Sequence, residues 1–271
     1  MTLSMTRSLA FSAGHRYWFA HLSEAENRGI FGQWASPFSH GHNYGLHVTV
    51  EGEVNVANGM IVNIKDVDAV IKAELLPQFS NRSLNDEVEF FADHAPTVEN
   101  ILSYTWSEIN RIGLPQEVTM THLKLEETST LYGEFDGMKT SLTRIYEFAA
   151  SHRLHAPALS QDENLKLFGK CNNPAGHGHN YVLEVTVSGT PNEQTGMICS
   201  LDDIDSIVNE RVVDRYDHRN LNEDISEFAG RATTSENVAI EIFSRLESHL
   251  PVQLERIRLY ETARNMFEVC R

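Results

Sequence analysis

Apolar residues at every second position mark a strand in each half of the chain. The stretch LHVTV at 46–50 has this spacing, and LEVTV at 183–187 repeats it. Because successive side chains of a strand face opposite sides, the pattern predicts strands with one buried face. Apolar residues at helical spacing follow at 67–75 and at 204–208, which predicts an amphipathic helix after each strand.

The remaining elements are also predicted twice and in the same order. The turn-rich stretches 52–59 and 189–196 predict hairpins leading to strands at 60–64 and 197–201. A second helix is expected after Pro96-Thr97 in the first half, and after the capping-box pair Thr233 and Glu236 in the second. Final strands are predicted at 121–127 and 255–261. Each half is therefore predicted to be an α+β domain, with an antiparallel four-stranded sheet and two helices on one face.

The two halves are copies of one sequence. FSAGHR at 11–16 returns as FAASHR at 148–153, an offset of 137 positions (152 − 15), and HGHN at 40–43 returns as HGHN at 177–180. Near the end the offset becomes 134, because KLEET at 124–128 matches RLYET at 258–262. A tandem duplication explains this register. We expect domains at 1–133 and 144–271, joined by a linker at 134–143.

Composition narrows the class of protein. The chain has 271 residues, 41% of them hydrophobic, and a formal net charge of −16. Such a charge repels nucleic acid and anionic membranes, so neither is an expected partner. There is no apolar run of membrane-spanning length, and we expect a cytoplasmic protein. The three cysteines form no even disulfide set and no CxxC motif, which favours free thiols.

Histidines form the main candidate site. His177 and His179 in HGHN lie two positions apart, so a strand presents both rings on one face. FAASHR, like FSAGHR in the first half, is predicted to form the first strand of its domain. His152, at the end of this strand, would complete a three-histidine set of the kind that holds catalytic zinc. The first half repeats the set, and because the histidines persist while their neighbours change, we predict zinc ligands in both halves: His15, His40 and His42.

Other candidate groups occur only in the second half. Cys171 precedes HGHN in an exposed, glycine-rich loop, where a nearby dication or Lys170 would lower its pKa and favour a nucleophilic or general-base role. Asp217 and His218 are adjacent, so the carboxylate can orient the imidazole. The first half has other residues at these three positions: Trp34, Ser80 and Asn81.

The second half resembles the 6-pyruvoyl-tetrahydropterin synthase family, which includes the 6-carboxy-tetrahydropterin synthases of queuosine biosynthesis. The resemblance rests on FAASHRL, FGKCNNPAGHGHNY, TGMI, YDHRNLN, TTSENV and YET, in this order over 148–262. It implies the tunnelling fold (T-fold), in which such domains close into barrels. It also implies a lyase that converts 7,8-dihydroneopterin triphosphate to 6-pyruvoyl- or 6-carboxy-tetrahydropterin with loss of triphosphate.

The resemblance further implies residue roles. Zinc would be held by His152, His177 and His179, Cys171 would act as general base, and Asp217 with His218 would relay protons. Glu261, and Glu127 in the first half, would bind the pterin edge. The first half would be a catalytically inactive but structurally required copy. Six domains per double barrel imply a homotrimer of tandem chains or a larger homo-oligomer. Two alternatives stay open: a non-catalytic pterin- or purine-binding module, and another zinc enzyme with a three-histidine site.

Overall fold

The computed structural model describes residues 2–271, which divide into two compact units. Unit 1 comprises residues 2–142 with Ser188–Ser200, and unit 2 comprises Thr143–Val187 with Leu201–Arg271. Across residues 2–271, no helix has both the length and the apolar character that crossing a membrane requires.

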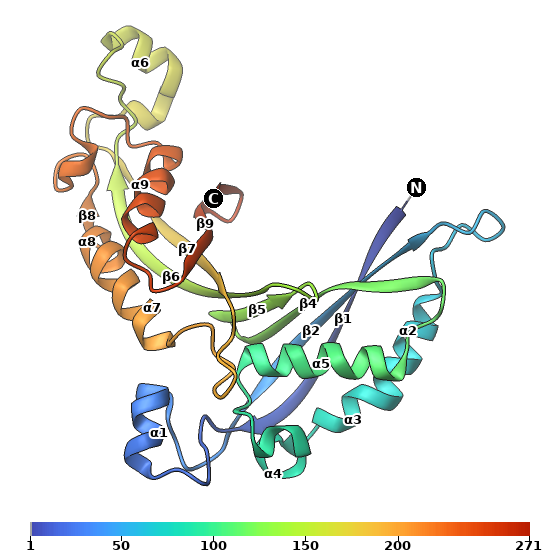
Figure 1. The fold of residues 1–271 in the computed structure, drawn as a ribbon. Helices are drawn as coiled ribbons and strands as arrows, with labels where there is room; N and C mark the ends of the chain where they lie inside the picture. Colours follow the sequence, from blue (N-terminus) through green and yellow to red (C-terminus); the bar gives the residue numbers. More distant parts are fainter. Residues whose placement is uncertain (1) are drawn as a thin grey trace. The chain divides into compact units, whose positions relative to one another are not determined.

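Unit 1 is a mainly antiparallel sheet with helices on one face (Figure 1). Its strand order is β5-β4-β2-β1-β3. The strands are β1 (Thr2–His15), β2 (His40–Glu53), β3 (Arg82–Ser83), β4 (Val118–Thr128) and β5 (Leu131–Phe135). The helices are α1 (Glu24–Phe31), η1 (Gly32–Trp34), α2 (Ile64–Val70), η2 (Ile71–Leu75), α3 (Leu76–Phe79), α4 (Leu84–Glu87), η3 (Glu89–Ala92) and α5 (Val98–Ile112). The long antiparallel pair β1–β2 places His15 opposite His40.

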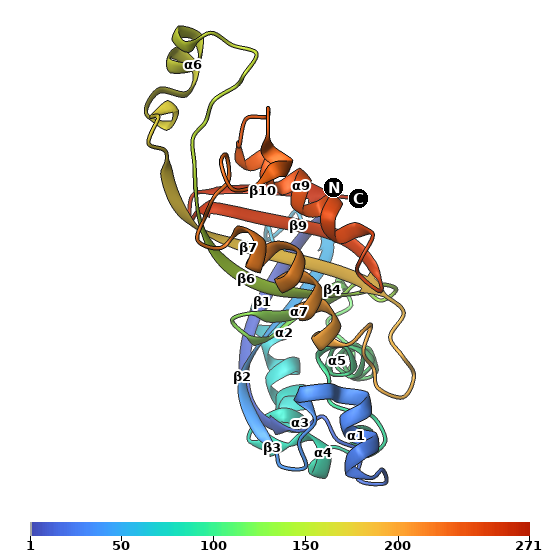
Figure 2. The same ribbon diagram turned by 90° about the vertical axis from the view of Figure 1, so that its left-hand side faces the viewer.

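Unit 2 repeats this arrangement with strand order β10-β9-β7-β6, and β8 pairs with β6 (Figure 2). The strands are β6 (Thr140–His152), β7 (His177–Gly189), β8 (Arg219–Asn220), β9 (Gln253–Thr262) and β10 (Asn265–Cys270). The helices are α6 (Gln161–Phe168), η4 (Gly169–Asn172), α7 (Leu201–Val208), η5 (Asn209–Val213), α8 (Asp214–Tyr216), η6 (Ser226–Phe228) and α9 (Ser235–Glu247). Both views show α6 beyond the ends of β6 and β7.

The predicted alternation along the strands is confirmed. Leu183, Val185 and Val187 of β7 are fully buried, and so are Leu46 and Val48 of β2. These residues form the sheet side of each core, and the apolar faces of the helices form the other side. Burial of this kind contributes roughly 25 cal/mol per Å² of apolar surface, which makes it the main term that stabilises each unit.

An ion pair repeated in both units joins the first strand to the first core helix. Arg7 Nε lies 2.5 Å from Asp68 Oδ1 in unit 1, and Arg144 Nη2 lies 2.7 Å from Asp205 Oδ2 in unit 2. The two arginines and the two aspartates are each 137 positions apart (144 − 7 and 205 − 68). The duplication therefore extends from the sequence to individual contacts.

The predicted strands at 60–64 and 197–201 are wrong. Residues 60–63 and 197–200 are loops, so Cys199 lies half-buried in a loop and not within a core strand. Local polar contacts hold the first loop: Asn58 Oδ1 accepts a hydrogen bond from the Met60 amide, and Asn63 caps α2. The fourth strand of each sheet is β5 or β10, which forms a hairpin with the strand before it.

The expected cap of the last helix is displaced by one residue. Thr234 caps α9 and accepts from the Asn237 amide, whereas the capping pair was predicted to be Thr233 and Glu236. Thr233 is not available for this purpose, because its hydroxyl donates to the Arg153 carbonyl at 3.1 Å. In unit 1 the helix predicted after Pro96-Thr97 is confirmed as α5, and Thr97 caps it.

The segment at 134–143, expected to be a linker, is mostly extended. β5 continues to Phe135 and β6 begins at Thr140. The turn between them is held by Asp136 Oδ1, which accepts from the amides of Met138 and Lys139.

Residues 188–200 contact α5 within unit 1. The Ile198 amide donates to Glu99 Oε1 at 3.0 Å, and Asn100 Nδ2 lies 3.5 Å from the Thr195 carbonyl oxygen. Burial raises the pKa of Glu99 to about 7, although the hydrogen bonds from Ile198 and from the Glu99 amide oppose the increase. The folded state therefore binds this proton more tightly than the unfolded state does.

We predict that Glu99→Gln makes the protein more stable relative to wild type as the pH rises. A carboxyl whose pKa is 4.5 when unfolded and about 7 when folded gives stability that is fully present below pH 4.5 and lost through pH 7, about 3 kcal/mol in all. Glutamine keeps the acceptor for Ile198 but has no charge to bury. Urea unfolding of both proteins at pH 5 and pH 8 measures the difference, and a gap that does not change with pH would contradict the prediction.

Candidate metal centres and active site

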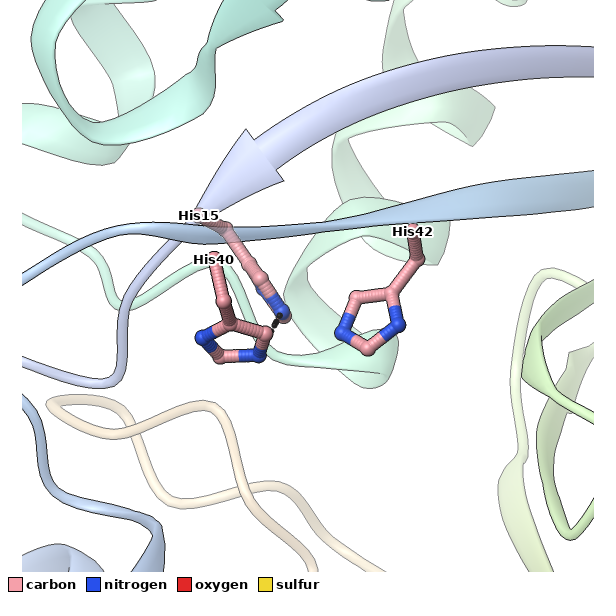
Figure 3. Close-up of side chains that lie close together, drawn as sticks. All are labelled: His15, His40 and His42. Carbon is pink, nitrogen blue, oxygen red and sulfur yellow. Dashed lines mark hydrogen bonds between the residues drawn. The ribbon is translucent and has the colours of Figure 1, made fainter.

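Each unit brings three histidines together at one end of its sheet. In unit 2, β6 ends at His152, and β7 begins with His177 and His179. One nitrogen from each of these three rings lies within 4.8 Å of the others, and the same holds for His15, His40 and His42 in unit 1. Figure 3 shows the unit 1 rings pointing toward one another from β1 and β2. Both predicted triads are therefore assembled in the structure.

A backbone carbonyl orients the most buried ring of each triad. His152 Nδ1 lies 2.7 Å from the Thr233 oxygen, and His15 Nδ1 lies 2.9 Å from the Pro96 oxygen. A carbonyl only accepts hydrogen bonds, so Nδ1 carries the proton in each ring and Nε2 presents a lone pair. This contact is typical of metal-bound histidine, where it fixes both the tautomer and the orientation of the ring.

The inner nitrogens have the spacing of metal ligands. His15 Nε2 and His40 Nε2 are 3.2 Å apart, close to the roughly 3.3 Å between two nitrogens that bind a tetrahedral zinc ion. In unit 2 His152 Nε2 and His179 Nε2 are buried without a hydrogen-bond partner. A cation bound between the rings would satisfy these two nitrogens, so the residues fit a metal ion.

The rings are also in the protonation state that a metal requires. Burial lowers the pKa of His15 to about 3, despite the opposing hydrogen bond to Pro96. Burial likewise lowers the pKa values of His40, His42, His152 and His179. These imidazoles are therefore neutral at pH 7 and able to bind a cation.

A carboxylate lies beside each triad. Glu261 Oε1 is 3.7 Å from His152 Nε2 and 3.8 Å from His179 Nε2, and Glu127 Oε1 is 3.9 Å from His42 Nε2. Burial alone would raise the pKa of Glu261, but hydrogen bonds from Ser235 and Asn265 and the nearby histidines bring it below the ordinary value. Glu261 is therefore ionised and points toward the metal centre.

Cys171 lies in η4, next to the chain that leaves the triad. Its carbonyl accepts from the Leu154 amide at 2.9 Å, two residues after His152. The thiol is free and partly exposed, and it is not one of the grouped ligand atoms. Trp34, at the matching position of unit 1, ends η1 and is also partly exposed.

Asp217 and His218 form a hydrogen-bonded dyad. Asp217 Oδ2 lies 2.7 Å from His218 Nδ1, and Asp217 Oδ1 accepts from the Ala149 amide at 2.7 Å. The Ala149 amide is the largest cause that lowers the pKa of Asp217, followed by His218. His218 has φ = 57°, and Asn81 of unit 1 has φ = 60°. The left-handed backbone at this position is therefore common to both units, and only the side chain differs.

The dyad borders a cavity of about 470 Å³, which His218 lines and to which the triad residue His179 also contributes. The further lining includes Ser151, Gly178 and Asn180. These three residues alternate with the triad along β6 and β7, so they face the other side of the sheet. Within unit 2 the structure therefore groups Glu261 with the triad, whereas the dyad borders the opposite face.

A family model described as 6-pyruvoyl tetrahydropterin synthase matches the chain twice, over residues 4–138 and 141–271. The chain belongs to the 6-pyruvoyl tetrahydropterin synthase family. The two matches confirm the duplication and the T-fold class, and membership makes the chain an enzyme, a lyase of tetrahydropterin synthesis.

Individual synthases match about one half of the chain. The 6-pyruvoyl tetrahydrobiopterin synthase of Homo sapiens is 46% identical over 129 residues, which is 47% of this chain and 89% of that protein. A putative 6-carboxy-5,6,7,8-tetrahydropterin synthase of Archaeoglobus fulgidus is 39% identical over 95 residues, 35% of this chain and 76% of that protein. The solved 6-pyruvoyl tetrahydropterin synthase of Caenorhabditis elegans is 39% identical, with a TM-score of 0.48, covering 49% of this chain and 96% of that one.

Two residues beside the triad support it, although the sequence pattern predicts no site role for either. The Ser235 hydroxyl donates to Glu261 Oε1 at 2.7 Å, and Thr233 supplies the carbonyl that orients His152. Both belong to the TTSENV motif, which signals their importance but not their contacts. Val98 replaces Ser235 in unit 1, so Glu127 lacks the matching hydroxyl.

We predict that each triad holds one metal ion. Elemental analysis of the purified protein should approach two ions per chain, and His177→Ala and His40→Ala should each remove about one, because two imidazoles bind zinc much more weakly than three. His249→Ala is the matched control, since His249 is exposed on the surface and distant in sequence from both triads. Unchanged metal content in both triad variants would contradict the prediction.

Proposed function

We propose that unit 2 is a zinc-dependent lyase that converts 7,8-dihydroneopterin triphosphate to 6-pyruvoyl-tetrahydropterin with release of triphosphate. The observation that carries this proposal is the triad at 152, 177 and 179, with the ionised Glu261 beside it and Cys171 in the adjoining segment. Three imidazoles favour zinc and leave a position for a substrate oxygen. When bound, such an ion would polarise that oxygen and acidify the neighbouring C–H bond.

The comparisons favour the pyruvoyl product over the carboxy product. Relatives named as pyruvoyl synthases are 46% identical over 129 residues in Homo sapiens and 42% over 127 in Drosophila melanogaster. The 6-carboxy synthase of Rickettsia typhi is 27% identical over 148 residues. The carboxy product is the second candidate within the same reaction class.

The chemistry of each side chain determines the role proposed for it. Glu261 has two acceptor oxygens that match the adjacent N–H groups of a pterin edge, and Ser235 holds one of them in place. The Cys171 thiolate would take the proton from carbon, and Asp217 would hold His218 as a proton donor. Because the dyad borders the opposite sheet face, we propose that it serves the metal centre of a neighbouring copy in a homo-oligomer.

Unit 1 is proposed to bind metal without turning over substrate. It keeps its triad and Glu127, but Trp34, Ser80 and Asn81 occupy the positions of the thiol and the dyad. No group of unit 1 at these positions can take or return a proton at neutral pH. The role left for this unit is structural.

We predict that Cys171→Ala abolishes product formation, lowering kcat at least 100-fold, while metal content is retained. The assay incubates purified protein with 7,8-dihydroneopterin triphosphate and identifies the pterin product and released triphosphate by chromatography and mass spectrometry. Cys270→Ala, which removes an exposed thiol at the end of β10, is the control and should keep full activity. If a metal-dependent hydrolysis survives Cys171→Ala, the result would instead favour a different kind of zinc enzyme that uses the three-histidine site. If the wild-type protein binds the pterin without turning it over, the result would favour a non-catalytic binding module.

We also predict that Glu261→Gln lowers kcat/KM by about 10- to 100-fold, or roughly 1–3 kcal/mol, chiefly through a higher KM. The amide has one acceptor oxygen and presents an N–H group where the pterin also donates. Glu126→Gln, which removes a partly exposed carboxylate on β4, should have little effect. Equal activity of Glu261→Gln and wild type at low substrate concentration would exclude the pterin-binding role.

A further inference from the structure

A second cavity of unit 2 lies where β6 ends and β7 begins. Its volume is about 200 Å³, and its lining includes Arg153, His155, Gly176 and Arg231. Arg153 directly follows the triad residue His152, and Gly176 directly precedes His177. The cavity shares Asn220 with the cavity of His218, so a substrate that reaches the dyad can extend into it.

The lining is more basic than the rest of this acidic chain. Arg153 donates only to neutral oxygens of Asn172, from Nε at 3.0 Å to the carbonyl and from Nη2 at 3.3 Å to the side chain. Arg231 Nη1 lies 3.3 Å from Glu241 Oε2 in an exposed ion pair. Exposed ion pairs contribute little to the free energy of folding. Glu223 is the one carboxylate in the lining. Two guanidinium groups thus remain available to an anion, in a chain of net charge −16.

Unit 1 has lost this feature at the same positions. Arg16, the counterpart of Arg153, makes a two-pronged ion pair with Asp86, at 2.7 and 3.0 Å. His94 replaces Arg231 and stacks on Phe90, with ring centroids 4.2 Å apart. Unit 2 therefore has two available guanidinium groups as well as the thiol and the dyad. Unit 1, which lacks the thiol and the dyad, also lacks available guanidinium groups at these two positions.

We propose that the cavity of Arg153 and Arg231 binds the triphosphate group of the substrate. The proposal rests on the proposed function for the identity of the ligand, but the chemistry is that of any linear polyphosphate. Planar guanidinium groups donate paired hydrogen bonds to phosphate oxygens. Arg219 lines the neighbouring cavity of His218 and is not part of this lining.

Isothermal titration of the full-length protein with inorganic tripolyphosphate tests the proposal. Arg231→Gln should weaken binding about 10-fold, which corresponds to roughly 1.4 kcal/mol, and Arg153→Gln should weaken it at least as much. Arg153→Lys, which keeps a charge, should recover part of the loss. Arg16→Gln in unit 1 is the matched control and should bind as wild type does. Metal content is measured for each variant, because tripolyphosphate also chelates metal ions.

The outcomes separate this proposal from the lyase assignment. Cys171→Ala should bind tripolyphosphate as wild type does, since the thiol is not part of the cavity lining. Weaker binding by Arg231→Gln at unchanged metal content supports the cavity even if no lyase activity is found. Wild-type affinity in both Arg231→Gln and Arg153→Gln overturns the proposal, even if the lyase activity is fully present. With active enzyme, Arg231→Gln should raise the substrate KM more than it lowers kcat.

Discussion

A hydrogen bond from a histidine ring to a backbone carbonyl determines the geometry of each metal centre. It joins the last residue of a long strand to the residue before a helix cap, from His15 to Pro96 and from His152 to Thr233. Both links span 81 residues, so the sheet and the second core helix must pack correctly before the ring is oriented. Once Nδ1 is occupied, Nε2 can only point toward the other two rings. The metal centre is thus a consequence of helix-on-sheet packing.

The two units show which parts of this arrangement serve structure and which serve chemistry. Both keep the triad, the carbonyl link and the Arg–Asp pair between strand and helix. Only unit 2 has the Asp217–His218 dyad, where unit 1 has Ser80 and Asn81. In unit 2 the Arg153 guanidinium donates to Asn172, whereas Arg16 of unit 1 is paired with Asp86. These two differences occur in the unit that also has the thiol of Cys171.

The opposite sheet faces of triad and dyad have a consequence for assembly. A strand directs alternate side chains to opposite sides, so the side chains of His179 and Asn180 leave the sheet on opposite faces. We therefore propose that a second copy of the sheet brings a dyad to each metal centre, and this is the physical reason for the proposed homo-oligomer.

The sequence by itself determined the duplication, the buried strands and both triads. Period-two spacing reports which face of a strand is buried, and HGHN fixes two rings on one face whatever surrounds them. The sequence did not determine that β5 and β10 are the fourth strands of the sheets, or that Thr234 caps α9. Nor did it determine that the dyad borders the sheet face opposite the triad. Each of these depends on contacts between residues far apart in the chain. Thr233, for example, looks like a cap in sequence, but tertiary packing commits its hydroxyl to Arg153 and its carbonyl to His152.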